Sequence, residues 1–565
     1  MSAHLASLLA DSNLIGTTLV HAGGNVPGAS PSTADLAGGV NILKLSNTSR
    51  AEIATDVRVN QGIAGSPAPL PDQDVRLRAT GVVETVHLAG QESVLGFPSG
   101  GGTAPATGGY FNGIFIENEA LARIDDGAIV SAIRDIRITA DSRTDVLSVV
   151  ENGAEGGSVG IRGAFSLVQL DARSVANVHD GATANAGRDV VLFANGVVQL
   201  VNLTGGVAAG AALGIGASAS LSEIDVRTVA LIGDPESAGG TTGPGSGSVT
   251  ANGSVRLDSV SNTEVLSMSV SGTGAQGDLE RTGSVRTFQA LEFGFGVSGD
   301  VAFNHVSVTT IAEIASQSVT AGQALEVTAV DFTELTAAAG GVLFANHAGL
   351  GGAFASQDFR RQTRARTRDS VLISPSLALR AQSDDDLLTL SEGGSGAVAN
   401  AAVAGSANFT ATSSVTEASL GERTGATIAG GVLVDSQADH GLDSVAGANA
   451  ANANGFFSGV ATVDLAALDA AALAFIAGEA DIDADGSVDV TSDLKDRVTS
   501  ISAAAGQSDL VGEATRFYAN DETGDPFDTN LGENVRDSDQ LTTAVALVDV
   551  DNDGDLDLVQ GNFST

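Results

Sequence analysis

The aspartates near the C-terminal end of the chain have the spacing of a metal-binding loop. They stand at positions 1, 3, 5 and 9 of a D-x-D-x-D-G-x-x-D string: Asp549, Asp551, Asp553 and Asp557. A Ca²⁺ ion takes about six to eight hard oxygen ligands, and alternate carboxylates on a tight turn can converge on one ion. Gly554 permits that turn, and the seventh position can add its backbone carbonyl. The string therefore predicts a calcium site, with a solvated acidic turn as the alternative.

The same spacing occurs once more, at Asp481, Asp483, Asp485 and Asp489. Here apolar residues alternate with the aspartates, which predicts a half-buried strand whose aspartates face outward. The string also aligns with residues 249–257, where Thr, Asn, Ser and Arg occupy the same outward positions. We therefore expect this second string to form the outer face of a strand and not a metal site.

A short element, Ala-x-Ile or Ala-x-Val with degenerate versions, recurs along the chain and is called the anchor below. Its alanines are Ala51, Ala122, Ala176, Ala230, Ala312, Ala365, Ala418 and Ala474. Most anchors follow one another at a nearly constant interval, whereas those from Ala51 to Ala122 and from Ala230 to Ala312 lie further apart. The longer intervals contain insertions, at 66–74 with 99–103 and at 239–247 with 277–289. A fixed period of this kind indicates a repeat protein.

Between anchors, apolar and polar residues alternate with period two, as in residues 249–257, which is typical of half-buried strands. A Gly/Ala-rich stretch such as 205–216 follows, and 461–477, the nearest approach to a helix, is also expected to be strand. We therefore predict an all-β fold, a parallel β-solenoid rod of about eight repeats of about 54 residues. With two or three coils per repeat, the rod would be on the order of 80–115 Å long. An array of small β-sandwiches is the weaker alternative.

The predicted solenoid core consists of small side chains, mainly Ala, Val and Leu with an occasional Phe. Four phenylalanines are expected to stack inside it: Phe165, Phe193, Phe303 and Phe354. The basic residues cluster in one place: Arg360, Arg361, Arg364, Arg366 and Arg368. Parity places Arg364, Arg366 and Arg368 on one face of a strand, and we expect this face to point outward and to pair with acidic residues of neighbouring coils. A docking patch for an acidic partner or a glycosaminoglycan is the alternative.

The composition narrows the classes of function. The chain of 565 residues has 27 Lys and Arg against 68 Asp and Glu, a formal net charge of −41, which argues against a nucleic-acid or anionic-membrane partner. The absence of Cys excludes a disulfide framework, a thiolate metal site and a Cys nucleophile. No apolar run approaches the roughly 18 residues of a membrane span. The N-terminal residues also lack the basic and apolar regions expected of a signal peptide.

The repeat region, roughly residues 46–505, resembles that of large bacterial filamentous adhesins of the leukotoxin-like and filamentous-haemagglutinin-like kind. The resemblance rests on the recurring anchor, the Val-x-Ala-x-Gly-x-Val-x-Val/Leu stretch and the Gly/Ala-rich segment. It implies an exported, surface-exposed rod with adhesive or interaction functions, and it implies no catalytic residue.

The acidic C-terminal segment resembles one FG-GAP/VCBS-type β-propeller repeat over about 50 residues. The match includes 516–521, 523–527 and 541–547, which leads into the aspartate loop. The resemblance implies that Asp549, Asp551, Asp553 and Asp557 bind Ca²⁺, with Asp555 contributing through its backbone or from outside the first ligand set. An EF-hand is not expected, because no Glu stands at position 12 and the flanks read as strand. A lone repeat cannot bury its faces, so the chain is expected to end inside a longer gene product.

Together these features predict an N-terminal segment or incomplete first repeat at 1–45, the solenoid at 46–505, and a linker with one acidic repeat at 506–565. The expected function is that of a non-enzymatic, adhesin-like protein at the surface of a bacterium or secreted from it. Its expected partners are a cell-surface glycan or protein, with lateral self-association. The alternatives are a polysaccharide-degrading enzyme on a β-helix scaffold and a purely structural spacer. The enzymatic alternative is disfavoured, because the chain has no Trp and only 2 Tyr and so lacks aromatic side chains on which sugars could stack.

Overall fold

The computed structural model describes most of the repeat region and short parts of the C-terminal segment. The described residues are 5–21, 35–60, 72–90, 105–156, 158–210, 212–234, 247–275, 294–398, 400–452, 457–508, 513–516, 542–548 and 557–562. Within these ranges no helix is long and apolar enough to cross a membrane.

The described residues form three sheets. Sheet A contains β1 (Leu5–His21), β4 (Asp74–Gly90), β7 (Ile136–Gly156), β10 (Val190–Gly210), β13 (Val255–Ala275), β16 (Ala324–Ala345), β19 (Ser376–Ala397), β22 (Val432–Asn452), β25 (Val488–Ser508), β27 (Thr542–Val548) and β28 (Asp557–Asn562). Sheet B contains β2 (Asp35–Ile53), β5 (Ala106–Ile124), β8 (Val159–Val178), β11 (Leu213–Gly233), β14 (Phe295–Ala315), β17 (Ala348–Arg368), β20 (Ala401–Leu420), β23 (Phe457–Ile476) and β26 (Glu513–Arg516). Sheet C contains β3 (Arg58–Val59), β6 (Ile129–Ala132), β9 (Thr183–Ala186), β12 (Ser248–Ala251), β15 (Ser318–Ala321), β18 (Val371–Ser374), β21 (Gly425–Ile428) and β24 (Asp481–Ala484).

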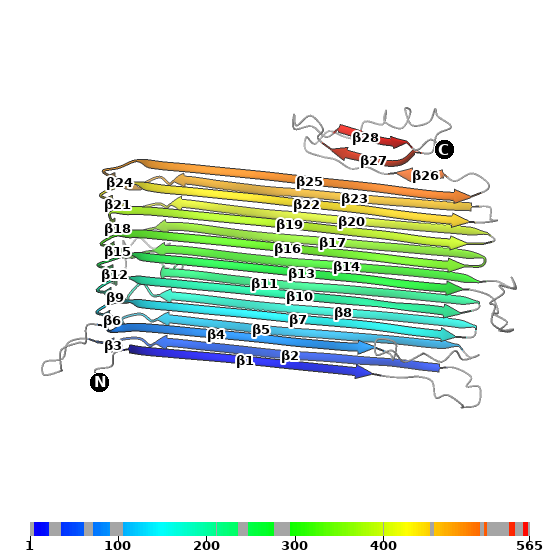
Figure 1. Ribbon diagram of the computed structural model, residues 1–565, viewed down its shortest axis with the longest axis horizontal. Helices are drawn as coiled ribbons and strands as arrows, with labels where there is room; N and C mark the ends of the chain where they lie inside the picture. The colour runs from blue at the N-terminus through cyan, green and yellow to red at the C-terminus, as the bar shows by residue number, and fades with distance from the viewer. Residues whose placement is uncertain are drawn as a thin grey trace.

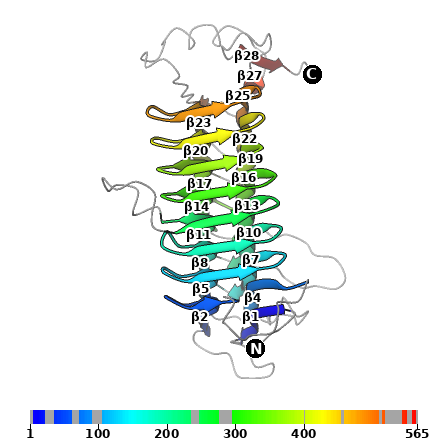
Figure 2. The same ribbon diagram turned by 90° about the vertical axis from the view of Figure 1, so that its left-hand side faces the viewer.

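Each turn of the chain contributes one long strand to sheet A, one long strand to sheet B and one short strand to sheet C. Figure 1 shows the long strands stacked in chain order, and Figure 2 shows sheets A and B running side by side through the stack. From β1 to β25, neighbouring strands within each sheet pair in parallel. The predicted all-β parallel β-solenoid is therefore confirmed.

The anchor alanines mark one register position of sheet B. Ala122 pairs with Ala176, Ala176 with Ala230, and Ala230 with Ala312, and the same column continues from Ala51 to Ala474. One repeat is therefore one coil, and the expectation of two or three coils per repeat is wrong. A repeat makes only one coil because its strands are long. A 21-residue strand such as β7 spans about 70 Å, and two such strands use most of the residues of a repeat.

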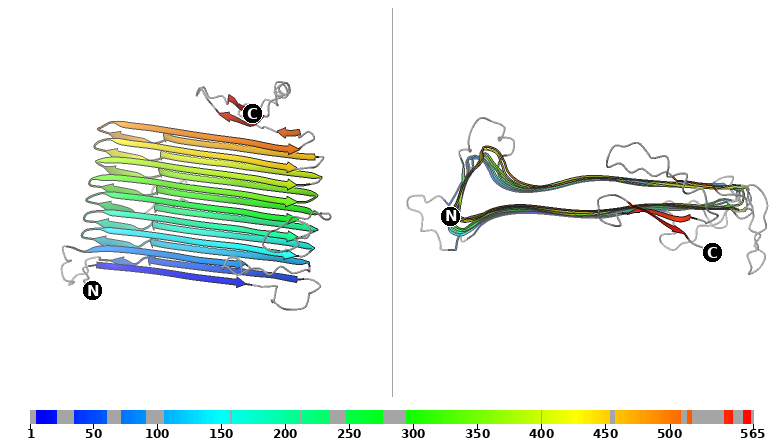
Figure 3. Two further views of the ribbon diagram at one scale, coloured as in Figure 1. Left: turned by 45° about the vertical axis from the view of Figure 1, so that its right-hand side comes forward. Right: turned by 90° about the horizontal axis from the view of Figure 1, so that it is seen from above.

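One coil per repeat also changes the expected shape. The eight coils from β1 to β24 rise only about 38 Å at about 4.8 Å per coil, which is less than the length of one strand. The longest axis of the molecule consequently lies along the strands, as Figure 1 shows. Seen from above in Figure 3, sheets A and B form a thin double layer that widens at the end where sheet C lies.

The predicted insertions fall between strands and leave the register continuous. Residues 61–71 separate β3 from β4, and 91–104 separate β4 from β5. Residues 235–246 separate β11 from β12, and 276–293 separate β13 from β14. These four segments lie outside the described residues. The strands on either side of them pair without a shift, so the two long anchor intervals still correspond to single coils.

The core beside sheet C is apolar and built from small side chains. Buried Ala, Val, Ile and Leu from all three sheets form one continuous cluster through the coils, which agrees with the predicted core composition. Between the two long sheets, in contrast, apolar columns alternate with polar ones. Asn112 donates to Ser148 Oγ at 2.7 Å, and the hydroxyls of Ser148 and Ser166 are 2.9 Å apart. Side-chain hydrogen bonds therefore join sheet A to sheet B inside the layer.

The prediction that Phe165, Phe193, Phe303 and Phe354 stack in the core is wrong. All four alternate with buried neighbours and point outward, and Phe354 is 38% exposed. Strand periodicity gives the reason, because Phe165 precedes the buried Ala176 by an odd number of residues and so faces the other side of sheet B. On that outer face Phe165 stacks against Phe111, with ring centroids 5.3 Å apart.

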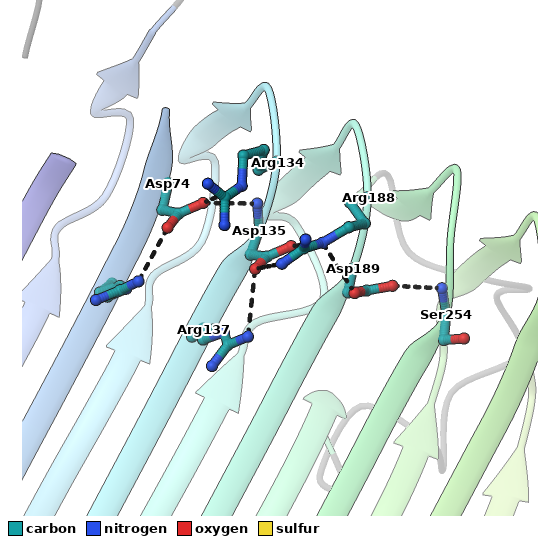
Figure 4. Close-up of polar contacts among 8 residues, drawn as sticks. Asp74, Arg134, Asp135, Arg137, Arg188, Asp189 and Ser254 are labelled. Atoms are coloured by element: carbon teal, nitrogen blue, oxygen red, sulfur yellow. Dashed lines mark hydrogen bonds and ion pairs between the residues drawn. The ribbon is translucent and has the colours of Figure 1, made fainter. Parts of the chain in front are cut away.

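The turn from sheet C into sheet A carries a ladder of aspartates and arginines on the early coils (Figure 4). The Asp74 carboxylate accepts a hydrogen bond from the backbone N–H of Asp135 (3.3 Å), and Asp189 accepts one from Ser254 (2.9 Å). Arg188 Nε donates to Asp135 of the preceding coil at 2.7 Å. Burial opposes ionisation of Asp135, but hydrogen bonding and charge from Arg188 outweigh it and lower the pKa of Asp135. The ladder therefore links successive coils at this edge.

Candidate functional site

The predicted calcium loop falls largely outside the described residues. Asp549, Asp551, Asp553 and Asp555 are not described, and Asp557 begins β28. β28 pairs antiparallel with β27, and Val548 faces Asp557 at the end of this hairpin. The flanks of the loop are thus strands, as expected. The alternate carboxylates suit a hard cation in such a connection, and calcium binding stays a prediction.

The second aspartate string forms the outer face of the last full coil, as predicted. In sheet C, strand pairing places Val249 and Ile482 in the same column. The predicted alignment of the second string with residues 249–257 is therefore confirmed. Ile482 and Ala484 pack against the apolar core, whereas Asp481 and Asp483 are exposed. Across the described part of the chain, no group of three or more His, Cys, Asp or Glu is arranged to hold a metal ion.

Four of the five clustered arginines pair with acidic residues on an outer face, as expected. Arg366 and Arg368 both contact Glu313 of the preceding coil, and Arg364 contacts Glu417 of the following one. Arg360 lies 3.4 Å from Asp358. These ion pairs agree with the expected outward face, and they partly neutralise the charge of the arginines.

Arg361 lies at an odd spacing from these residues; it points between the sheets and is fully buried. It donates to Asp385 and, at 2.6 Å, to Ser414 Oγ, and its Nη1 lies 3.9 Å from Asp331 Oδ1. His440 Nδ1 is 2.8 Å from Asp385 Oδ2. Burial raises the pKa of Asp331 to about 6, although Arg361 acts in the opposite direction. These groups are sealed between the sheets, so we assign them a structural role.

The outer face of sheet B carries an apolar surface that crosses eight coils. It consists of four register columns, which together are called the apolar strip. The first wall is Thr107, Ile161, Ile215, Val297, Leu350, Val403 and Gly459. The glycine column is Gly38, Gly109, Gly163, Ala217, Gly299, Gly352, Gly405 and Ala461. The second wall is Val40, Phe111, Phe165, Ala219, Val301, Phe354, Ala407 and Val463. The outer column is Ile42, Gly113, Leu167, Leu221, Phe303, Ser356, Phe409 and Leu465.

The glycine column is the floor of a groove that runs along the stack, across the strands. The groove has a volume of about 1360 Å³ and is lined by strands from β2 to β23. Its wall side chains are well exposed for their size, with Leu350 at 52% and Val40 at 65%. None of the residues that make up the apolar strip is charged. An exposed apolar patch of this extent is typical of an interaction surface.

Towards sheet C the same face becomes charged, with acidic residues and arginines side by side. Glu117, Asp171, Glu223 and Asp225 line a second, smaller hollow of about 560 Å³. Arg173 neutralises Asp171 through two hydrogen bonds of 2.9 and 3.0 Å. Burial, followed by the neighbouring Asp171, raises the pKa of Asp225. Sheet B therefore presents an apolar half and a charged half to solvent.

Sequence reasoning missed the apolar strip, although a signal for it is present. A glycine or alanine stands at one fixed distance before every anchor alanine, for example Gly163 before Ala176 and Gly352 before Ala365. At the second position after this small residue, each repeat has Val, Phe or Ala. Alignment of the repeats on the anchor would have revealed both columns.

No protein-family model, curated protein or solved structure matches the chain. The resemblances to filamentous adhesins and to FG-GAP/VCBS repeats stay hypotheses.

Proposed function

We propose that this chain is a non-enzymatic, adhesin-like repeat protein of a bacterial surface, or secreted from it, which binds its partner through the apolar strip of sheet B. The observation that supports this proposal is the strip itself, since it is uncharged and exposed in a chain whose net charge is −41. A soluble acidic protein gains nothing from an exposed apolar face unless another surface covers it. A purely structural spacer would not need such a face.

The second element of the proposal is the C-terminal aspartate loop. Asp549, Asp551, Asp553 and Asp557 would hold Ca²⁺, and Asp555 would contribute through its backbone or from outside the first ligand set. A bound cation would neutralise the carboxylates that otherwise repel one another in the loop between β27 and β28. The solenoid would then present both a broad apolar contact surface and a calcium-dependent module.

The experiment uses beads coated with the full chain and surfaces that carry arrayed extracellular glycans, extracellular proteins and the chain itself. The second wall of the strip is changed at two neighbouring coils by Val301→Lys with Phe354→Lys, and the matched control is Val270→Lys with Val342→Lys on the outer face of sheet A. All four residues are exposed, so neither pair should unfold the coils. We expect bead retention to be lost with the strip variant and kept with the control. Retention by neither wild-type nor variant beads, or equal retention by both variants, would overturn the proposal.

A further inference from the structure

We propose that the partner of the apolar strip is a second copy of this chain, bound face to face through the same strip. This inference rests on the proposed function, because it names the partner of the proposed binding surface. It is carried by the glycine column, by the shape of the strip and by the distribution of charge on sheet B.

Except at Gly38, where an added Cβ would lie 2.9 Å from a backbone oxygen, the fold itself does not require glycine at the floor of the groove. A Cβ atom added at Gly163 or Gly299 would meet no atom within 4 Å, and one added at Gly352 would meet only a backbone oxygen at 3.9 Å. Glycine inside a strand costs roughly 0.5–1 kcal/mol relative to alanine. These glycines therefore cost the single chain stability at several coils, and a contact made outside the chain would compensate this cost.

The columns of the strip are complementary to themselves. A two-fold axis in the plane of the interface and parallel to the stack reverses the order of the columns while it keeps the order of the coils. The glycine column of one chain then faces the second wall of the other, and the first wall faces the outer column. The rings of Phe165 and Phe354 would enter the partner's groove, and the same contact would be repeated with the two chains exchanged.

The area is sufficient for a stable dimer. Four columns, each two residues apart along the strand, span about 27 Å, and eight coils span about 38 Å. Each chain would thus cover roughly 1,000 Å², a total of roughly 2,000 Å², at the upper end of standard protein interfaces. Two sheets can pack face to face in this way at about 10 Å separation.

Charge favours this arrangement over other face-to-face arrangements. The charged half of sheet B begins beyond the outer column, and it holds acidic residues such as Glu117 and Asp171 together with arginines such as Arg360 and Arg364. Reversal of the columns places the charged halves of the two chains at opposite ends of the dimer, so the contact covers no charged column. Two chains with a net charge of −41 each can then meet through their uncharged halves, and added salt should strengthen the contact by screening the remaining repulsion.

The test measures the mass of the full chain by sedimentation over a range of concentrations. We expect the wild type to reach twice its 56.1 kDa at micromolar concentration. Gly299→Gln with Gly352→Gln fills the groove without a change in charge and should raise the dissociation constant by at least about tenfold. The matched control, Gly274→Gln with Gly340→Gln, lies on the outer face of sheet A, where the added Cβ atoms also have room, and should leave the dimer intact.

A second readout uses a tryptophan, because the chain has none. Phe354→Trp places the indole in the second wall, and we expect its emission to shift to the blue as the chain concentration rises. A monomeric wild type, or a dimer that survives the groove variant, overturns the inference. If the emission shifts when phosphatidylcholine vesicles are added but not when the protein concentration rises, the strip binds lipid, and the inference of a second copy is overturned as well. A monomer that still retains beads through the strip overturns this inference alone and leaves the proposed function standing.

Discussion

The guanidinium of Arg361 on sheet B donates to the carboxylate of Asp385 on sheet A, and neither side chain is exposed to solvent. With Asp331 and His440, this pair forms an ionic cluster inside the layer. Elsewhere the layer is joined mainly by hydrogen bonds of Ser, Thr and Asn, and at Asp300 and Asp464 by hydrogen bonds to a carboxylate. Buried charges of this kind are tolerated only while all partners are present, because each partner alone would be an uncompensated charge in a medium of low polarity.

Removal of the arginine should therefore destabilise the coils around it. We expect Arg361→Met to lower the free energy of unfolding by about 3–5 kcal/mol, because Asp385 and Asp331 lose their counter-charge. The adjacent Arg360 is exposed and faces the other side of the strand, so Arg360→Met should change stability by less than about 0.5 kcal/mol. Urea unfolding with hydrogen exchange at β17, β19 and β22 measures both variants. Equal effects of the two substitutions would contradict the assignment of the buried cluster.

A buried aspartate should make stability depend on pH. Burial raises the pKa of Asp300 to about 7, although hydrogen bonds from Ser218 and Ser271 act in the opposite direction. The folded chain therefore keeps a proton that the unfolded chain has lost from roughly pH 4 upward, and stability falls as the pH rises through the window from roughly 4 to 7. Asp300→Asn should flatten this fall and stabilise the chain at pH 8 by on the order of 1–3 kcal/mol.

Thermal unfolding from pH 4 to pH 8 tests the role of Asp300. The control is Asp469→Asn, on the exposed face of β23. It should leave the pH profile of the wild type unchanged. A profile of Asp300→Asn that matches the wild type at every pH would contradict this prediction.

The two aspartate strings allow a matched test of calcium binding. Asp551→Asn with Asp553→Asn removes two charged ligands from the C-terminal loop and should weaken Ca²⁺ binding by at least about tenfold. Asp483→Asn with Asp485→Asn makes the same change at the same spacing on the last coil and should have no effect. Isothermal titration of the full chain with Ca²⁺ measures both. Loss of binding in the second variant, or no binding by the wild type, would contradict the prediction.

The anchor column should be sensitive to size, because its alanines are buried in successive coils. Ala230→Leu overpacks the core beside sheet C, and we expect it to cost about 1–3 kcal/mol. Ala338→Leu makes the same change on the outer face of β16 in sheet A, and it should leave thermal stability nearly unchanged. A melting temperature lowered equally by both changes would contradict the inward and outward assignments.

The anchors and the second aspartate string show how much of the fold was predictable. Repeats of nearly equal length could be aligned on Ala122, Ala176 and Ala230, and the structure pairs these residues directly. The outward face of the second string followed from period-two alternation alone, as in Asp481 and Ile482. Such local patterns are visible in the sequence because one face of each strand is buried and must be apolar.

The number of coils and the position of the phenylalanines could not be inferred in the same way. Gly205 and Gly206 belong to the Gly/Ala-rich stretch that follows the alternating residues, and both lie within β10. Hydrogen bonds to the strands of neighbouring coils on both sides hold such glycines in extended conformation, and this support comes from partners a full coil away in the sequence. Phe165 looked like a core residue because size and hydrophobicity do not reveal the side of a strand. The side is set by whether the residue lies an odd or an even number of positions from the buried anchor alanine.

The apolar strip is tested most directly by oxidative footprinting of the unmodified chain at low and high concentration. Phe354 and Phe409 lie on the strip at 38% and 45% exposure, and Phe332 and Phe344 lie on the outer face of sheet A at 41% and 58%. We expect labelling of the first pair to fall as the concentration rises, while labelling of the second pair stays constant. Labelling of Phe354 and Phe409 that does not depend on concentration would contradict a strip that binds a second copy of the chain.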